Sequence, residues 1–131
     1  VPHRWAFVHD HIGYNYRMPN INAALGCAQM ENLDRYVSNK RETAERYREF
    51  FSHIPDVEFV VEPANSRSNY WLNAVLLKDR RAHTNDHGVM TRPVWELMNR
   101  LEMFRGCETD GLENTVWLEE RIVNIPSSVR L

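Results

Sequence analysis

Cysteine and lysine are scarce in this 131-residue chain, and its net charge is small. Two cysteines are too few for a scaffold that depends on disulfides, so we interpret Cys27 and Cys107 as reduced thiols of a cytoplasmic protein, with Cys27 buried on a helix. A formal charge of -2 provides no basic field for nucleic acid and no polybasic membrane patch. No apolar run approaches the roughly 18 residues that a membrane span needs.

Motifs of the common catalytic and nucleotide-binding classes are missing as well. The sequence contains no Gly-x-Ser-x-Gly elbow, Walker-type loop or dinucleotide fingerprint. His9 and His11 lie two apart, and His83 and His87 have the i, i+4 spacing that can place two imidazoles on one helix face. No glutamate completes a His-Glu-x-x-His arrangement, so we expect solvated histidines and no metal.

The composition is that of one folded domain, since 43% of the residues are hydrophobic and 11% are aromatic. Residues 1–18 show no sustained period, which predicts an extended arm or loop. A helix is predicted to begin at Pro19 or Asn20, because proline suits the first helical position and asparagine suits a cap. Apolar residues then recur at helical spacing until Pro55. Such a helix would be about 50 Å long, so we expect a bend near Ser38–Asn39.

The remainder of the chain alternates β-like runs with short helical segments. Strands are predicted at residues 57–61, 70–77 and 89–91 and from Ile122 onward, and helical turns at 94–101 and 112–121. A long helix followed by such elements predicts an α/β or α+β domain with a small sheet.

The most informative segment lies immediately before the predicted helix. Residues 13–20 read Gly-Tyr-Asn-Tyr-Arg-Met-Pro-Asn, a cluster of polar and aromatic side chains. A helix N-terminus favours anions through its free N–H groups and its dipole. Asn15 can donate hydrogen bonds, and Arg17 can hold a phosphate or carboxylate with two parallel bonds. Composition alone favours an ordered helix entry over an anion site, and both interpretations stay open at this point.

Five blocks, in order along the chain, resemble the DegT/StrS family of sugar aminotransferases. The first contains the Gly-x-Asn-Tyr-Arg-Met signature, and the blocks cover residues 13–26, 28–33, 68–73, 88–95 and 123–128. They are most similar to the branch that makes 4-amino sugars on a UDP carrier. The resemblance implies the C-terminal small domain, residues 19–131, of a fold-type I transferase that depends on pyridoxal 5'-phosphate.

In such enzymes an amino group passes from an amino-acid donor, usually glutamate, to a keto-sugar nucleotide, and the enzyme works as a homodimer in cell-surface sugar biosynthesis. The resemblance places Asn15, helped by Arg17, on the cofactor phosphate of the partner subunit. It places Asn69, Trp71 and Arg92 on the sugar-nucleotide side. Taken as a strand residue, Trp71 could instead belong to the core.

The sequence departs from the family pattern in its lysines. The family's cofactor lysine lies in a Ser/Gly-rich loop of the large domain, whereas Lys40 lies on the predicted helix and Lys78 follows a predicted strand. We therefore assign no catalytic residue, and expect a fragment without the large domain that is inactive alone and holds no covalent cofactor. The alternative is a non-catalytic module that binds an anion or self-associates.

Overall fold

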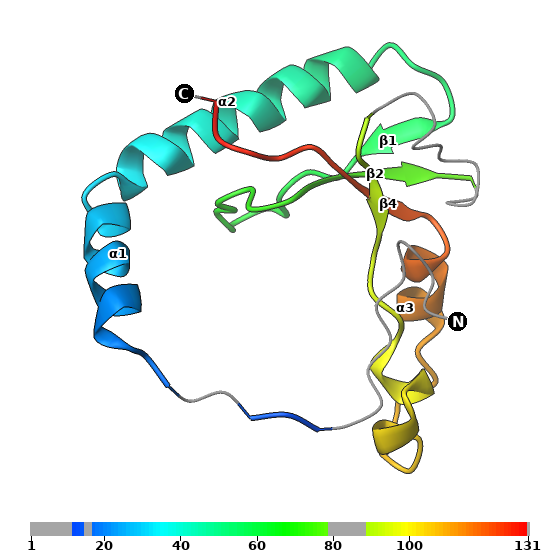
Figure 1. Ribbon diagram of the computed structural model, residues 1–131. Helices are drawn as coiled ribbons and strands as arrows, with labels where there is room; N and C mark the ends of the chain where they lie inside the picture. The colour runs from blue at the N-terminus through cyan, green and yellow to red at the C-terminus, as the bar shows by residue number, and fades with distance from the viewer. Residues whose placement is uncertain (1–11, 15–16, 79–88, 131) are drawn as a thin grey trace.

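The computed structural model describes residues 12–14, 17–78 and 89–130 (Figure 1). Two consecutive α-helices are followed by a small sheet, into which short helices are inserted. The elements are α1 (Asn20–Met30), α2 (Leu33–Phe51), β1 (Val57–Phe59), β2 (Asn73–Leu77), β3 (Arg92–Pro93), η2 (Met98–Arg100), η3 (Glu102–Phe104), α3 (Glu113–Glu119) and β4 (Ile122–Ile125). Among these, no helix is long and apolar enough to cross a membrane.

The four strands form one antiparallel sheet in the order β1-β2-β4-β3. β4 is the last strand in sequence, but it lies inside the sheet, where Val75 pairs with Val123 and Asn124 pairs with Arg92. The combination of helices with a small antiparallel sheet confirms the mixed α/β prediction. The helix predicted near the end of the chain and the strand that follows it are also confirmed, as α3 and β4.

The core lies between α2 and one face of the sheet. Its buried apolar side chains come from α2 and three strands: Ala44, Phe59, Val75, Val123 and Ile125. Tyr47 and Phe51 extend this core along α2, and the ring of Phe51 stacks on that of Phe59 with a centroid distance of 6.5 Å. Because side chains alternate along a strand, Asn124 and its partner Arg92 belong to the opposite face.

The long helix is interrupted, but not where we predicted. The chain is continuously helical through Ser38–Asn39, and the break lies instead at the turn Glu31–Asn32. The Asn32 side chain donates a hydrogen bond of 3.1 Å to the Ala28 carbonyl, in competition with the helical backbone ladder. α1 begins at Asn20, and Pro19 takes the capping position that we had expected an asparagine to fill.

Two strand boundaries also differ from the prediction. β2 begins at Asn73 and not at Tyr70, because Tyr70 has a φ of 46° and is therefore incompatible with an extended strand. The strand predicted at 89–91 is wrong, and pairing occurs at Arg92–Pro93, an edge position where proline is tolerated.

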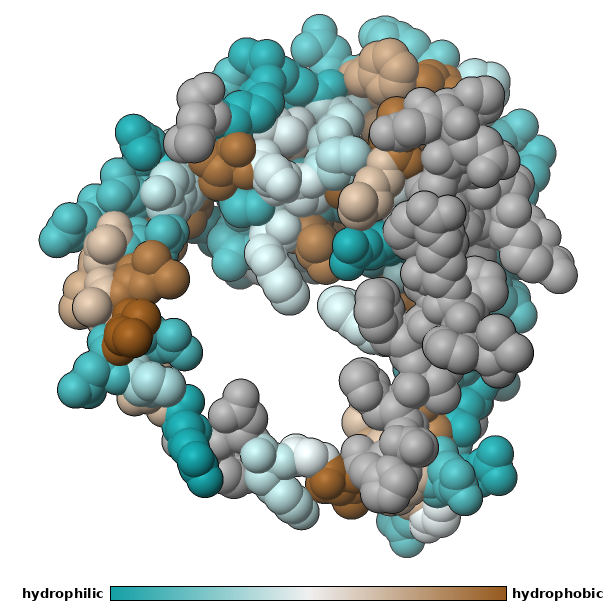
Figure 2. Space-filling view, viewed as in Figure 1, coloured by the Kyte–Doolittle hydropathy of each residue, from teal (hydrophilic) through white to brown (hydrophobic). Residues whose placement is uncertain are grey.

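Two further expectations need correction. Only the end of the helical stretch predicted at 94–101 is helical, as the 3-10 turn η2. Cys27 is exposed and not buried, because none of the residues of α1 is buried in this chain. Figure 2 shows hydrophobic side chains on the surface over α1 and open space between that helix and the sheet.

Candidate functional site

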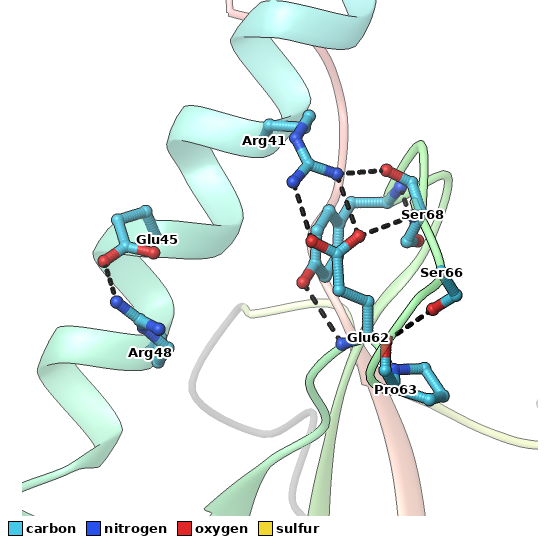
Figure 3. Close-up of polar contacts among 8 residues, drawn as sticks. Arg41, Glu45, Arg48, Glu62, Pro63, Ser66 and Ser68 are labelled. Atoms are coloured by element: carbon cyan, nitrogen blue, oxygen red, sulfur yellow. Dashed lines mark hydrogen bonds and ion pairs between the residues drawn. The ribbon is translucent and has the colours of Figure 1, made fainter.

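A pair of charged residues attaches the loop between β1 and β2 to α2. Arg41 Nη2 donates to Glu62 Oε1 at 2.7 Å, and Arg41 Nη1 donates to Glu62 Oε2 at 3.0 Å (Figure 3). The same guanidinium donates to the Ser68 carbonyl at 2.6 Å, and the Ser68 N–H donates back to Glu62 Oε2 at 2.6 Å. We call these three residues the Arg41–Glu62–Ser68 clamp.

The clamp holds both ends of a short loop in one place. Glu62 begins the loop and Ser68 ends it, so a single guanidinium fixes the two together. The Arg41 hydrogen bond, followed by the Ser68 N–H, lowers the pKa of Glu62 from 4.5 to about 2. Side-chain exposures of 32% for Arg41 and 24% for Glu62 show that the pair is partly buried and keeps some contact with solvent.

Beyond the clamp, the chain presents Trp71 on a fixed backbone. The Trp71 N–H donates to Asn69 Oδ1 at 2.9 Å, and the Trp71 carbonyl accepts from Lys40 Nζ at 3.3 Å. Trp71 as a whole residue is 66% exposed. The alternative that Trp71 is a core residue is therefore wrong, because it precedes the strand and faces solvent.

The C-terminal segment runs back along α2 and is attached to it by three side chains. Tyr47 Oη donates to the Pro126 carbonyl at 3.0 Å, and Lys40 Nζ donates to the Ser127 carbonyl at 2.5 Å. Further along, the N–H of Arg130 donates to the side-chain oxygen of Asn39 at 2.9 Å. Lys40 thus joins two segments of the chain, the loop at Trp71 and the C-terminal segment.

These elements enclose a groove of about 470 Å³, which we call the α2 groove. Its walls are Gln29, Leu33, Tyr36, Val37, Lys40, Asn69, Trp71 and Val129. The structure therefore brings together two predicted site residues, Asn69 and Trp71. Arg92 is not among the lining residues, and its exposed guanidinium lies 3.4 Å from Met90 Sδ.

Sequence reasoning missed Lys40 as a site residue. Burial lowers the pKa of its ammonium group, and within the described part of the chain it donates hydrogen bonds to two neutral carbonyls, those of Trp71 and Ser127. A signal was present in the sequence, because Leu33, Tyr36, Val37 and Lys40 recur at i, i+3, i+4 and i+7 on one helix face. A lysine on the apolar face of a helix is a stronger indication of a site residue than a lysine on a solvated face.

Arg17 lies away from the groove, in the exposed segment before α1. The first turn of α1 contains no acidic residue, so an anion there would meet no repulsion from a carboxylate of that turn. Asn15 lies outside the described residues, as do the four histidines considered for a metal site. Across the residues that the structure does describe, no three His, Cys, Asp or Glu side chains are grouped as metal ligands.

Comparison with known proteins assigns the chain to a family. The model of the DegT/DnrJ/EryC1/StrS aminotransferase family matches residues 2–131. The GDP-perosamine synthase of Vibrio cholerae is 37% identical over 129 residues, which cover 91% of this chain and 35% of that protein. The GDP-perosamine synthase of Escherichia coli O157:H7 is 36% identical over 102 residues, covering 73% of this chain and 28% of that protein.

The fold agrees with solved structures of similar proteins. The sugar aminotransferase CalS13 of Micromonospora echinospora superposes with a TM-score of 0.73 at 24% identity, covering 91% of this chain and 33% of that one. The chain spans about a third of the length of the curated relatives it matches. The family match extends over nearly every residue, and we conclude that the chain belongs to the DegT/DnrJ/EryC1/StrS aminotransferase family.

Proposed function

We propose that this chain is part of a nucleotide-sugar aminotransferase, which transfers an amino group from an amino acid, glutamate, to a keto-sugar nucleotide. The match of the family model to residues 2–131 is the observation that carries this proposal. The α2 groove supports it, because the predicted substrate residues Asn69 and Trp71 both line it. Arg92 lies outside the groove, so any contact between its guanidinium and the substrate would be made elsewhere.

The aminotransferases of this family depend on pyridoxal 5'-phosphate, and the residues before α1 fit its phosphate group. Arg17 is exposed and, within the described residues, its guanidinium has no ion-pair partner. It precedes a helix N-terminus, whose free N–H groups favour an anion. Arg17 and Asn15 would bind the phosphate. The cofactor, when bound, supplies an electron sink, while the protein orients the reacting groups.

We further propose that the chain associates with a second copy of itself. Apolar side chains on and beside α1 supply a surface for it, with Ile21 82% and Leu25 61% exposed. In such a homodimer, Asn15 and Arg17 would reach the partner's cofactor.

An amino-transfer assay tests the proposed function. The complete protein that contains this chain is incubated with glutamate, pyridoxal 5'-phosphate and keto sugars carried on UDP or GDP, and the 2-oxoglutarate released is measured. Both carriers are needed because the resemblance implied UDP, whereas the relatives are named for a GDP sugar. We expect cofactor-dependent transfer by the complete protein and none by the 131-residue chain.

The alternative is a non-catalytic module that binds an anion or self-associates. The exposed α1 face is compatible with such a module as well, as is Arg17, which has no ion-pair partner among the residues that the structure describes. No transfer by the complete protein with either carrier would contradict the aminotransferase proposal. Phosphate binding or self-association without any transfer would favour the module.

A further inference from the structure

We propose that Lys40 is a positioning residue for the proposed amino transfer. It joins the backbone at Trp71 to the C-terminal segment, residues 126–130, and so sets where the Trp71 side chain meets the substrate. The inference rests on the proposed function, in which Trp71 contacts the keto-sugar nucleotide. It gives a role to a lysine for which the family resemblance had none. A closed ring of hydrogen bonds and a strained stretch of backbone support it.

Lys40 belongs to a ring of hydrogen bonds that connects α2, the residues before β2 and the C-terminal segment. Its ammonium group donates to the Trp71 carbonyl at 3.3 Å and to the Ser127 carbonyl at 2.5 Å. The ring closes because the Asn73 N–H, two residues after Trp71, donates to Ser127 Oγ at 2.7 Å. Ser127 Oγ in turn donates to the Ile125 carbonyl at 2.7 Å, at the end of β4. The position of Trp71 is therefore set relative to β4 as well as to α2.

A lysine suits this place for a chemical reason. An ammonium group has three N–H donors and no acceptor, so it can join two carbonyls from different segments. The aliphatic stem of Lys40 continues the apolar helix face of Leu33, Tyr36 and Val37 that lines the α2 groove. Removal of the ammonium group would release the Trp71 carbonyl from α2 while leaving an apolar stem in place.

The backbone before Trp71 depends on such attachments. Tyr70 has a φ of 46°, which is unfavourable for a bulky residue and persists only where surrounding contacts enforce it. The clamp holds the chain on one side, at Ser68, and Lys40 holds it on the other side, at Trp71. Trp71 is exposed, so core packing does not set its direction. Without Lys40 the strained backbone can relax, and Trp71 moves with it.

A double-mutant cycle in the complete protein tests the inference. KM is measured for whichever keto sugar, carried on UDP or GDP, the unmodified protein accepts in the amino-transfer assay. Lys40→Met and Trp71→Ala should each raise this KM by roughly tenfold and leave the KM for glutamate unchanged. The double variant should resemble Trp71→Ala alone, because Lys40 acts through Trp71. Lys40→Arg retains donors for both carbonyls and should return KM most of the way to its original value.

Matched controls separate positioning from stability. Lys78→Met removes the other lysine, which pairs with Asp56 at 2.7 Å and does not line the α2 groove. Val123→Ala weakens the core without removing a member of the ring. Both variants should keep the KM of the unmodified protein. If Lys40→Met does not fold, Ser127→Ala replaces it, because it removes the hydroxyl that closes the ring and should raise the same KM.

Hydrogen exchange separates failure of this inference from failure of the proposed function. In the complete protein, Lys40→Met should speed exchange at residues 68–73 and 126–130 together. Asn39→Ala removes only the acceptor of the Arg130 N–H, so it should speed exchange in the C-terminal segment alone.

The outcomes divide as follows. Unchanged exchange in Lys40→Met, an unaltered KM, or additive effects on KM in the double variant would overturn the inference, and amino transfer by the unmodified protein would still support the function. Faster exchange at both segments without amino transfer by the unmodified protein would support the attachment through Lys40 and contradict the function.

Discussion

Arg41 and Glu62 meet in a two-point ion pair that connects α2 to the loop between β1 and β2, 21 residues away in sequence. The geometry is that of a planar guanidinium matched to a planar carboxylate, which fixes orientation as well as distance. Through Ser68, the pair sets where Asn69 and Trp71 emerge from the loop. The pair therefore acts on the candidate site by positioning it and does not contact the groove itself.

The clamp predicts acid sensitivity. The folded-state pKa of Glu62, about 2, lies below its ordinary value of 4.5, so its stabilising effect is complete above about pH 4.5 and is lost as the pH falls through 2. Glu62→Gln should lower the free energy of unfolding at neutral pH and flatten its decline between pH 4.5 and 2. Urea unfolding at several pH values measures both effects.

Glu45→Gln is the control for this prediction. Glu45 pairs with Arg48 on the exposed side of the same helix, and exposed pairs contribute little (Figure 3). This variant should unfold like the unmodified chain at every pH. If Glu62→Gln and Glu45→Gln lower the free energy of unfolding equally, removal of a negative charge explains the effect and the clamp does not.

The attachment of the C-terminal segment depends on Tyr47. Tyr47→Phe keeps the ring in the core but removes the hydroxyl that donates to the Pro126 carbonyl. We expect the free energy of unfolding to fall by about 0.5–1 kcal/mol, the net contribution of a neutral hydrogen bond. Tyr36→Phe is the matched change in the groove wall and should have less effect. A Tyr47→Phe variant with unchanged urea midpoint would contradict this attachment.

Val123 is the most buried apolar residue of the core, with 1% of its surface exposed. Val123→Ala removes two methyl groups and leaves a cavity under α2. We expect a loss of about 2–3 kcal/mol in the free energy of unfolding. Val61→Ala changes an exposed valine and should cost less than about 0.5 kcal/mol. Similar losses for both variants would mean that the core does not lie where the structure places it.

The exposed face of α1 predicts self-association. The chain should sediment as a dimer or larger species, because so much apolar surface is unstable in water. Leu25→Glu should shift it toward monomer by placing a charge on that face. Met98→Glu introduces the same charge on an exposed methionine of η2 and should leave the association unchanged. A chain that is monomeric throughout the concentration range would indicate that another part of a longer protein covers α1.

The proposed cofactor contact is tested in the complete protein. Asn15→Ala should weaken retention of pyridoxal 5'-phosphate, because a hydrogen bond to a charged group contributes about 1.5–3 kcal/mol, or roughly 10- to 150-fold in affinity. Equilibrium dialysis with the cofactor measures this change directly. Asn114→Ala, on the exposed surface of α3, is the control. Equal affinity of the unmodified protein and Asn15→Ala would contradict the assignment.

Much of this molecule follows from local patterns in the sequence. Helical spacing predicted the residues of α1 and α2, and the β-like run from Ile122 predicted β4, because these signals depend on neighbours within a few positions. The ordered motif blocks indicate the family, and they also point to Asn69 and Trp71. The break at Asn32 was missed, since it depends on one side chain bonding to the carbonyl of Ala28.

The groove, by contrast, exists only in the folded chain. Lys40 contacts the Ser127 carbonyl, 87 positions away, and the Trp71 carbonyl, 31 positions away. The local sequence cannot predict these long-range contacts. They form because β4 lies between β2 and β3, which brings the C-terminal segment back along α2. The same strand order places β3 at the edge of the sheet, separated from β2 by β4. Arg92 on β3 therefore lies apart from Asn69 and Trp71, which precede β2. Residue types and spacing thus determined the elements and the family, while long-range packing decided which side chains share a site.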